Sequence, residues 1–167
     1  VVDASTRREP LQRKIGSGQP PAQFRRLLRE GKAGHAGLKD SLALIAHCLG
    51  WQVRDIVETG GPVVAKRTIR TQYFTVKTGQ TCGLHQRAEA KRNGKVCLTL
   101  DLRMYLDAPE PHDAVQIVGN PPLELVLPGG VAGDQATVAA LVNTAPRLMQ
   151  APAGLRLLSE LSLPHMA

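Results

Sequence analysis

The residues best suited to chemistry lie close together near the start of the chain. Arg7 and Arg8 carry forked N–H donors that match a carboxylate or a phosphate group. Lys14 can supply a point charge or a proton. The turn Gly16-Ser17-Gly18 can present backbone N–H groups and a hydroxyl to an anion. The stretch therefore predicts an anion site with an acid–base lysine, although a loop whose arginines pair with nearby acidic residues would have the same sequence.

The net charge of the chain, +7, is concentrated in this same region. Residues 1–32 contain eight Lys or Arg against three Asp or Glu, so they carry +5 of the total. Such a charge attracts a carboxylate substrate, a cofactor phosphate or nucleic acid, unless it is only a solvated basic arm. Nucleic acid is the weakest of these options, because aromatic residues make up only 3% of the chain and no recognition module is visible.

The composition excludes several classes of protein. With 43% hydrophobic and 21% charged residues among 167, the chain is typical of a folded soluble domain. It has no run of about 18 apolar residues, so no membrane span is expected. Three cysteines cannot form a disulfide framework, which favours a reducing, cytoplasmic compartment. The five histidines are scattered and no Cys-x-x-Cys pair occurs, so we predict no metal site.

Residues 1–18 are expected to form a polar loop. Within them, Val1 and Val2 resemble the end of a strand that enters this loop. Two helices should follow. The first opens at Pro20-Pro21 and ends at Gly31. The second is predicted over residues 36–49, because apolar residues recur there at helical spacing. This inner stripe consists of Leu38, Leu42, Ile45 and Leu49, and Cys48 is expected in the core.

A β-hairpin around Asn93-Gly94 is the clearest strand signal. Its second arm, residues 96–106, alternates apolar and polar residues. A two-residue turn and a three-residue loop with Gly94 in a bulge are both conceivable. The three-residue loop keeps one face apolar, so we expect that register. It places Cys82 opposite Met104 and Cys97 opposite Glu89, which makes a disulfide between the two cysteines improbable.

The other strands are expected at residues 51–58, 63–77, 114–118 and 123–127, with a break at Gly60-Gly61-Pro62. Residues 128–133 form a glycine-rich turn, for which a structural role is favoured over phosphate binding. A last helix is predicted with Asp134 as its cap and Pro146 as its end or kink. This order of elements predicts an α+β fold with a mixed, largely antiparallel sheet and helices packed on one face.

Four stretches of the chain together resemble the C-terminal domain of the 2,4-diaminopentanoate dehydrogenase family, which is similar to dihydrodipicolinate reductase. They are Ser5–Gly18, Gly34–Trp51, Gly129–Pro146 and Ala151–Leu155. The resemblance implies an NAD(P)-dependent oxidoreductase whose Rossmann domain precedes Val1 and binds most of the NAD or NADP. Residues 1–18 would then be a basic substrate arm, and residues 19–167 a substrate-binding and oligomerisation domain. The implied reaction is reversible hydride transfer at a carbon that bears an amino or imino group.

The resemblance also suggests roles for single residues. Lys14 followed by Ser17-Gly18 is similar to the lysine and Ser-Gly-Thr turn of the dipicolinate reductases, where the lysine is a proposed proton donor and the turn binds a carboxylate. Here Gln19 replaces the threonine, and the histidines expected before the lysine are absent. An amino-acid dehydrogenase is therefore favoured over a dipicolinate reductase.

Two hypotheses follow. In the first, the chain is the substrate domain of a cytoplasmic, homo-oligomeric NAD(P)-dependent amino-acid dehydrogenase or imine reductase, assembled through its sheet and inactive as a fragment. Lys14 is then the catalytic residue and Arg7, Arg8, Ser17 and Gly18 bind an amino-acid-like carboxylate substrate. His35 is a further candidate, although it could simply cap or pack the second helix. In the second, the chain is a non-catalytic basic module that binds nucleic acid or another polyanion.

Overall fold

The computed structural model describes residues 1–161, so the last six residues of the predicted second domain lie outside the described residues. The chain divides into two compact units at Gly130. The first unit contains β1 (Val2–Asp3), α1 (Glu9–Lys14), α2 (Pro21–Arg29), α3 (Leu38–Cys48), β2 (Arg54–Val64), β3 (Ile69–Arg70), β4 (Thr75–Val76), β5 (Thr81–Arg92), β6 (Lys95–Tyr105), β7 (His112–Ile117) and β8 (Leu123–Pro128). The second contains α4 (Gly133–Gln150) and the short 3-10 helix η1 (Leu158–Glu160).

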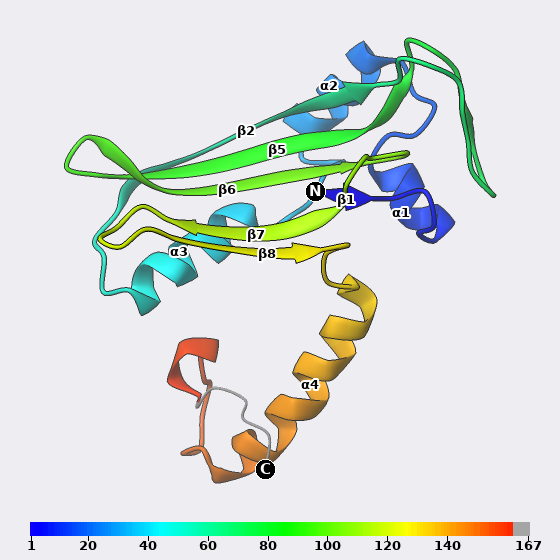
Figure 1. Cartoon of the computed structure of the whole chain (residues 1–167). Helices are drawn as coiled ribbons and strands as arrows, with labels where there is room; N and C mark the ends of the chain where they lie inside the picture. The colour runs from blue at the N-terminus through cyan, green and yellow to red at the C-terminus, as the bar shows by residue number, and fades with distance from the viewer. Residues whose placement is uncertain (162–167) are drawn as a thin grey trace. The chain divides into compact units, whose positions relative to one another are not determined.

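A four-stranded sheet with the order β1-β6-β5-β2 organises the first unit (Figure 1). β1 runs parallel to β6, and the other pairs are antiparallel. The helices α2 and α3 pack on one face of this sheet. β3 pairs with β4, and β7 with β8, as separate two-stranded ribbons. The predicted α+β class with a mixed, largely antiparallel sheet is therefore confirmed.

Two apolar clusters lie on the covered face of the sheet. One gathers the first residues of the chain and α2 against the end of β5, through Ala4, Ile15, Phe24 and Leu84. The other joins α3 to the middle of β5, through Leu38, Leu42, Ala88 and Ala90. Between Leu84 and Ala88 the same face of β5 carries Gln86, a buried polar side chain. Along β5 the two buried clusters are thus separated by a polar residue, while Leu102 of β6, opposite Gln86, packs against both.

The helices of the first unit confirm the helical spacing predicted for residues 36–49, but they differ from the prediction in other respects. Residues 1–18 are not a loop throughout, because β1 and the six-residue α1 lie within them. In α3 the buried side is formed by Leu38, Leu42 and Ala46, four residues apart, so the stripe is narrower than predicted. Ile45 and Leu49 fall at its margin and are 39% and 50% exposed. Cys48 is exposed as well, so its expected core position was wrong.

The β5–β6 hairpin has the predicted apolar face but a different register. Arg92 pairs with Lys95 across a two-residue turn, in which Asn93 and Gly94 both have positive φ, 53° and 75°. A bulge beside Cys97 then shifts the pairing, so that Leu84 opposes Met104. The prediction of a three-residue loop was wrong, because the bulge lies within the strand and not at the turn. Cys82 and Cys97 are both free thiols, and burial raises the pKa of Cys82.

The strand β2 runs without interruption through Gly60-Gly61-Pro62, where a break was expected. Its position at the edge of the sheet explains this result. A proline in an edge strand can turn its nitrogen away from the neighbouring strand, so no ladder hydrogen bond is lost. The β-rich segment 63–77 is not a single strand either, because after β2 it forms the small β3–β4 hairpin.

The uncovered face of the sheet carries paired charges. Asp101 accepts hydrogen bonds from His85 and Arg103, both at 3.0 Å, while Arg87 pairs with Glu89 at 2.7 Å. Burial raises the pKa of the Asp101 carboxyl, but the hydrogen bonds and charges of His85 and Arg103 outweigh it and hold the pKa below its ordinary value of 3.8. Positive and negative side chains therefore neutralise one another along this face.

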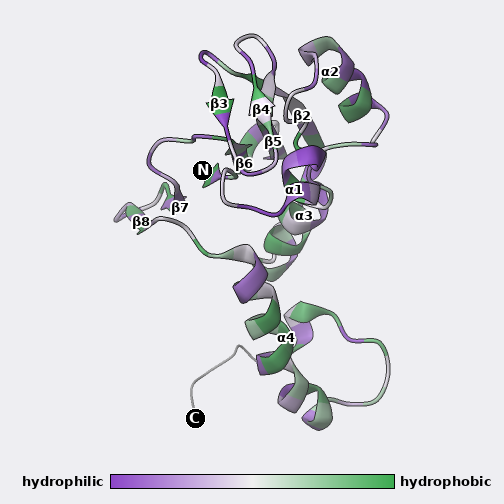
Figure 2. Ribbon diagram, turned by 90° about the vertical axis from the view of Figure 1, so that its right-hand side faces the viewer, coloured by the Kyte–Doolittle hydropathy of each residue, from purple (hydrophilic) through white to green (hydrophobic). Residues whose placement is uncertain are grey.

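In the second unit, α4 begins at Gly133 with Ala132 as its N-cap. Asp134 lies in the first turn and is not the cap, and the helix continues for four residues beyond Pro146 instead of ending there. Apolar residues recur along α4 (Figure 2), but none of its residues is buried. Val138, Leu141, Val142 and Ala145, which helical spacing would place together on one side of α4, are thus all exposed within the described residues. Among residues 1–161, no helix has the length and hydropathy needed to cross a bilayer.

A single glycine in β5 tests the packing of this sheet. A Cβ atom on Gly83 would lie 2.2 Å from the Cβ of Tyr105, whereas one on Gly61 in β2 would have no neighbour within 4 Å. We expect Gly83→Ala to lower the free energy of unfolding by about 3 kcal/mol or more. The matched Gly61→Ala should change it by less than about 1 kcal/mol. Urea unfolding measures both, and equal stabilities would contradict the close approach of β6 to Gly83.

Candidate functional site

A basic cavity of about 590 Å³ opens on the covered side of the sheet, next to Gln86. Several elements contribute charged or polar side chains to its lining. These are Lys14 at the end of α1, Lys32 and His35 from the loop after α2, Lys39 in the first turn of α3, and Glu58 and Gln86 from β2 and β5. Arg29 of α2 also lines it, so that four cations face one carboxylate.

The side chain of Gln86 holds the cavity wall in place. Its Oε1 accepts a hydrogen bond from the backbone N–H of His35 at 2.7 Å. Its Nε2 donates to the carbonyl of His35 at 3.2 Å and to the Glu58 carboxylate at 2.8 Å. A buried amide must satisfy its donors and acceptor, because an unpaired buried polar group is costly. Gln86 therefore fixes both the loop that carries His35 and the carboxylate of Glu58.

The loop between α2 and α3 is shaped by glycine. Gly31, Gly34 and Gly37 all have positive φ, between 67° and 93°. At Gly34 a Cβ atom would also lie 2.8 Å from Leu28 and 3.2 Å from the Gln86 amide oxygen. Only glycine allows the backbone to approach Gln86 this closely, so the spacing of glycines in the sequence sets the shape of the cavity.

Lys14 is positioned by the fully buried side chain of Gln12 in the same helix. The Gln12 Nε2 atom donates to the carbonyls of Ser5 and Arg7, at 3.0 and 2.8 Å. Its Oε1 atom accepts a hydrogen bond from the Thr71 hydroxyl at 2.8 Å. Ile15 packs into the first apolar cluster just behind. The short helix α1 is thereby held at both sides, and its last residue, Lys14, is brought to the cavity.

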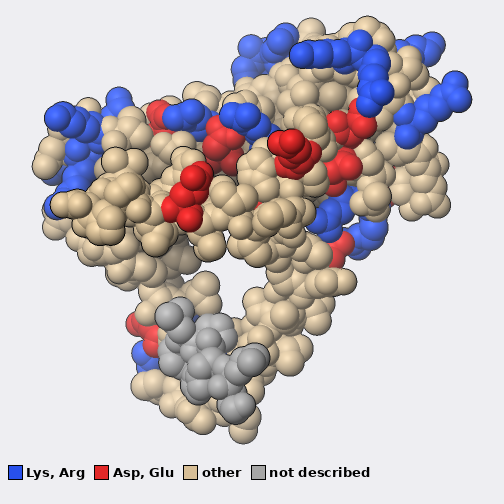
Figure 3. Space-filling view, viewed as in Figure 1, with Lys and Arg blue, Asp and Glu red and all other residues tan. Residues whose placement is uncertain are grey.

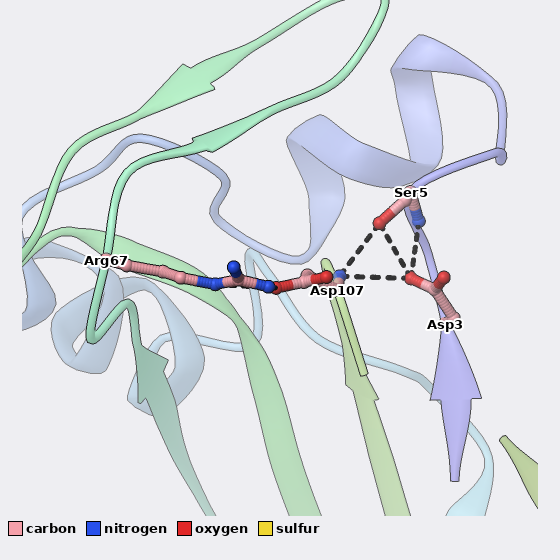
Figure 4. A network of polar contacts seen from close by, with 4 residues as sticks. All are labelled: Asp3, Ser5, Arg67 and Asp107. Atoms are coloured by element: carbon pink, nitrogen blue, oxygen red, sulfur yellow. Dashed lines mark hydrogen bonds and ion pairs between the residues drawn. The ribbon is translucent and has the colours of Figure 1, made fainter. Parts of the chain in front are cut away.

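A second network attaches the start of the chain to the end of β6 (Figure 4). The Asp3 carboxylate accepts hydrogen bonds from the Ser5 hydroxyl at 2.7 Å and from the Asp107 backbone N–H at 3.1 Å. The Asp107 side chain forms an ion pair with Arg67. The chain before α1 is therefore anchored on the sheet and is not a solvated arm.

The structure brings together two of the six residues predicted for the site. Lys14 and His35 both line the cavity, whereas Arg7 and Arg8 precede α1 and do not. Ser17 is buried, and it does not line the cavity.

The N–H groups of the Gly16–Gln19 turn are used inside the protein. The N–H of Ser17 donates to the carbonyl of Gln12, and that of Gly18 donates to the carbonyl of Thr81. Those of Gly16 and Gln19 donate to Arg13 and Gly16. The turn therefore supports α1 and β5 in this structure and offers no free backbone donor to an anion.

Sequence reasoning missed the residues that complete the cavity. Lys32 and Lys39 flank the regularly spaced glycines, a signal that was visible in the sequence. Gln86 also left a signal, as a polar residue in the middle of an apolar strand face. Glu58 left none, because its proximity depends on the pairing of β2 with β5. Within residues 1–161, no three His, Cys, Asp or Glu side chains are grouped so that they could hold a metal ion.

Comparisons with known proteins agree with this architecture. The family model of the 2,4-diaminopentanoate dehydrogenase C-terminal domain matches residues 1–167. The chain therefore belongs to this family of dehydrogenase C-terminal domains. It is 26% identical over 156 residues to the 2,4-diaminopentanoate dehydrogenase of Acetoanaerobium sticklandii, covering 90% of this chain and 44% of that protein.

The fold also occurs in a solved structure. The amine dehydrogenase from Mycobacterium smegmatis matches with a TM-score of 0.77 and 20% sequence identity, over 94% of this chain and 47% of the other. The chain thus spans less than half the length of both relatives.

Removal of the Gln86 amide tests how the cavity wall is held. We expect Gln86→Leu to lower the free energy of unfolding by about 1–3 kcal/mol, because the His35 N–H loses its acceptor. Hydrogen exchange at the His35 amide should become faster. Gln116→Leu is the control, since Gln116 lies exposed on β7 and bonds to Glu124. Unchanged protection of the His35 amide would show that the loop does not depend on Gln86.

Proposed function

We propose that this chain is the substrate-binding part of an NAD(P)-dependent oxidoreductase that acts on the C–N bond of an amino-acid-like substrate. The observation that carries the proposal is the cavity beside Gln86, where cations and a single fixed carboxylate face the same space. Membership of a dehydrogenase domain family supports an oxidoreductase activity of the full-length protein.

The charges of the cavity match a zwitterionic amino acid. Lys14, Lys32 and Lys39 can attract and hold a substrate carboxylate, although Lys32 also pairs with Glu30 at 2.9 Å. Glu58 is oriented by Gln86 and can pair with a substrate ammonium group. A site that holds both ends of a substrate fixes the carbon between them, which hydride transfer requires.

Lys14 is the residue we propose for proton transfer. Conversion of an amine into an imine, and the reverse, moves a proton at the substrate nitrogen, and a positioned side chain can carry it. Lys14 and His35 line the same cavity, so His35 is proposed as a polar contact to the substrate. Arg7, Arg8, Ser17 and Gly18 lie outside this lining, and their role in substrate binding stays a prediction.

The nicotinamide cofactor, NAD or NADP, supplies or accepts the hydride. Residues 1–161 contain no Rossmann-type βαβ unit, because the only parallel strand pair in this part of the chain, β1–β6, is two residues long and the chain between its strands also forms β2 and β5 of the same sheet. In the glycine-rich turn after β8, the N–H groups of Gly129 and Gly130 donate to Pro111 and Leu127. We therefore propose that the cofactor binds outside these residues. The cytoplasmic location of the protein stays a prediction.

Steady-state kinetics of the full-length protein with an amino-acid panel and both cofactors test this function. We expect Lys14→Ala to lower kcat by about 10²–10⁴-fold. Glu58→Gln keeps the hydrogen bond to Gln86 but removes the charge, so it should raise KM about tenfold. The control Lys77→Ala removes an exposed charge outside the cavity and should behave as the unchanged protein. Normal turnover by Lys14→Ala would remove this lysine from the mechanism.

We also propose that the uncovered face of the sheet joins two copies of the chain. Val57 of β2 lies on this face opposite Glu89 and is 50% exposed. The adjacent Arg87–Glu89 and Asp101–Arg103 pairs are already formed, so covering this face would bury no unpaired charge among them, and a second copy would have to satisfy their remaining hydrogen-bonding groups.

Sedimentation at micromolar concentration tests the proposed assembly. The protein should sediment as a species larger than 17.9 kDa, and Val57→Glu should shift it towards the monomer. Leu49→Glu is the matched control, because Leu49 is also 50% exposed but lies at the end of α3. A monomer at all concentrations would overturn this interface.

A further inference from the structure

A second basic cavity lies at the far end of the sheet, where the β5–β6 hairpin turns. It has a volume of about 620 Å³, and its lining includes Arg54, Asp55, Lys91 and Arg92. It shares no lining residue with the cavity beside Gln86. Gln86 and Lys91 are five residues apart on β5, which corresponds to about 17 Å along a strand. This cavity is therefore separate from the proposed substrate site.

Like charges stand directly opposite each other at this end of the sheet. In the β2–β5 pairing Arg54 faces Lys91, and in the β5–β6 pairing Arg92 faces Lys95. Opposed like charges destabilise an antiparallel pair. Two such pairs next to each other work against folding unless something else neutralises them.

The chain neutralises its charges elsewhere on the same strands. Arg87 pairs with Glu89, and Asp101 with His85 and Arg103. Arg54, Lys91, Arg92 and Lys95, in contrast, form no ion pair within 4.0 Å in the described part of the chain. Figure 3 shows the resulting group of blue side chains over the tip of the β5–β6 hairpin, on the left of the view.

The local backbone and one aromatic ring hold these cations in position. The Arg92 guanidinium lies over the Trp51 ring, 5.7 Å from its centroid, which restricts its motion and leaves its edge free to donate. A bulge between Arg54 and Val57 interrupts the β2–β5 ladder beside the cavity. Bulges commonly re-aim side chains beside binding sites. The cluster is thus an ordered arrangement of donors.

We propose that this hairpin-tip cavity binds a phosphate-bearing ligand. Three cations and the one carboxylate of Asp55 line the cavity, so two positive charges remain, which is more than a single carboxylate ligand can neutralise; Lys95, opposite Arg92, adds a further positive charge beside it. A phosphate group brings more than one negative charge and several acceptor oxygens, which match the forked donors of Arg54 and Arg92. The phosphate can be free or part of a nucleotide, and both sources present the same chemistry to these side chains.

Trp51 provides a direct measurement, since it is the only tryptophan of the chain. Titration of the 167-residue protein with inorganic pyrophosphate should change its tryptophan fluorescence with a Kd below about 1 mM. Calorimetry should give the same Kd. Parallel titrations with inorganic phosphate and ADP distinguish a free from a nucleotide phosphate. The signal should weaken with added salt, because surface charges are screened.

Two variants with different expected effects on pyrophosphate binding make the test specific. Lys91→Glu turns a repulsive pair into an Arg54–Glu pair, so it should weaken pyrophosphate binding at least about tenfold and raise Tm of the free protein by about 2 °C. Arg87→Gln on the same strand removes a positive charge that already has a partner, so it should leave binding within about twofold.

Three results would overturn the proposal. One is the absence of any fluorescence change and heat with pyrophosphate, phosphate and ADP at 10 mM, about ten times the expected limit. Another is an equal loss of binding in Arg87→Gln, which would indicate general attraction by net charge. The third is binding of a DNA duplex or heparin without binding of pyrophosphate, which would assign the cluster to a macromolecular partner.

Discussion

The arrangement of the first unit depends on one buried amide. Gln86 lies on the apolar face of β5, and its three hydrogen bonds reach the His35 backbone and the Glu58 carboxylate. It lies between the two buried clusters, which Leu102 of the neighbouring strand also links. The glycine-rich loop approaches this amide closely: a Cβ atom at Gly34 would lie 3.2 Å from the Gln86 amide oxygen, a tight contact, and 2.8 Å from Leu28, which is too close. Because a buried amide must be satisfied, Gln86 holds in place both the loop and the carboxylate that line the cavity.

Much of the fold could be predicted from the sequence, because local patterns determine it. The prolines at its start and the glycine at its end located α2, helical spacing located α3, and alternation located β6. The predictions that were wrong concern features that depend on how one strand pairs with its neighbours. The break expected at Gly60-Gly61-Pro62 does not occur, since β2 is an edge strand, and the hairpin register was missed because a bulge beside Cys97 decides it. For the site, Lys14 and His35 were found, but Glu58 becomes a neighbour only through strand pairing.

Charged side chains are arranged in two different ways on the sheet: as opposite-charge pairs on one face, and as groups with an excess of cations at two cavities. On the uncovered face each carboxylate has a basic neighbour, and the low pKa of Asp101 reflects this pairing. In the cavity beside Gln86, and again at the hairpin tip, cations outnumber carboxylates. An excess of charge of one sign opposes folding, which is the reason why we propose both concave places as binding surfaces. This contrast between paired and excess charges distinguishes parts of the sheet that the net charge does not, because most of the net charge falls in the first 32 residues.

The parallel pairing of β1 with β6 has a consequence for folding. The hydrogen bond from the Asp107 N–H to the Asp3 carboxylate joins residues 104 apart in sequence, and the N–H of His112 donates to the carbonyl of Val1, more than a hundred residues earlier in the chain. Contacts of such long range form slowly, because a large loop must close before they contribute. During synthesis, the start of the chain cannot dock until β6 has left the ribosome. Since α1 is held by the same segment, Lys14 reaches its place only when the first unit is nearly complete, and a partly folded chain has no assembled cavity.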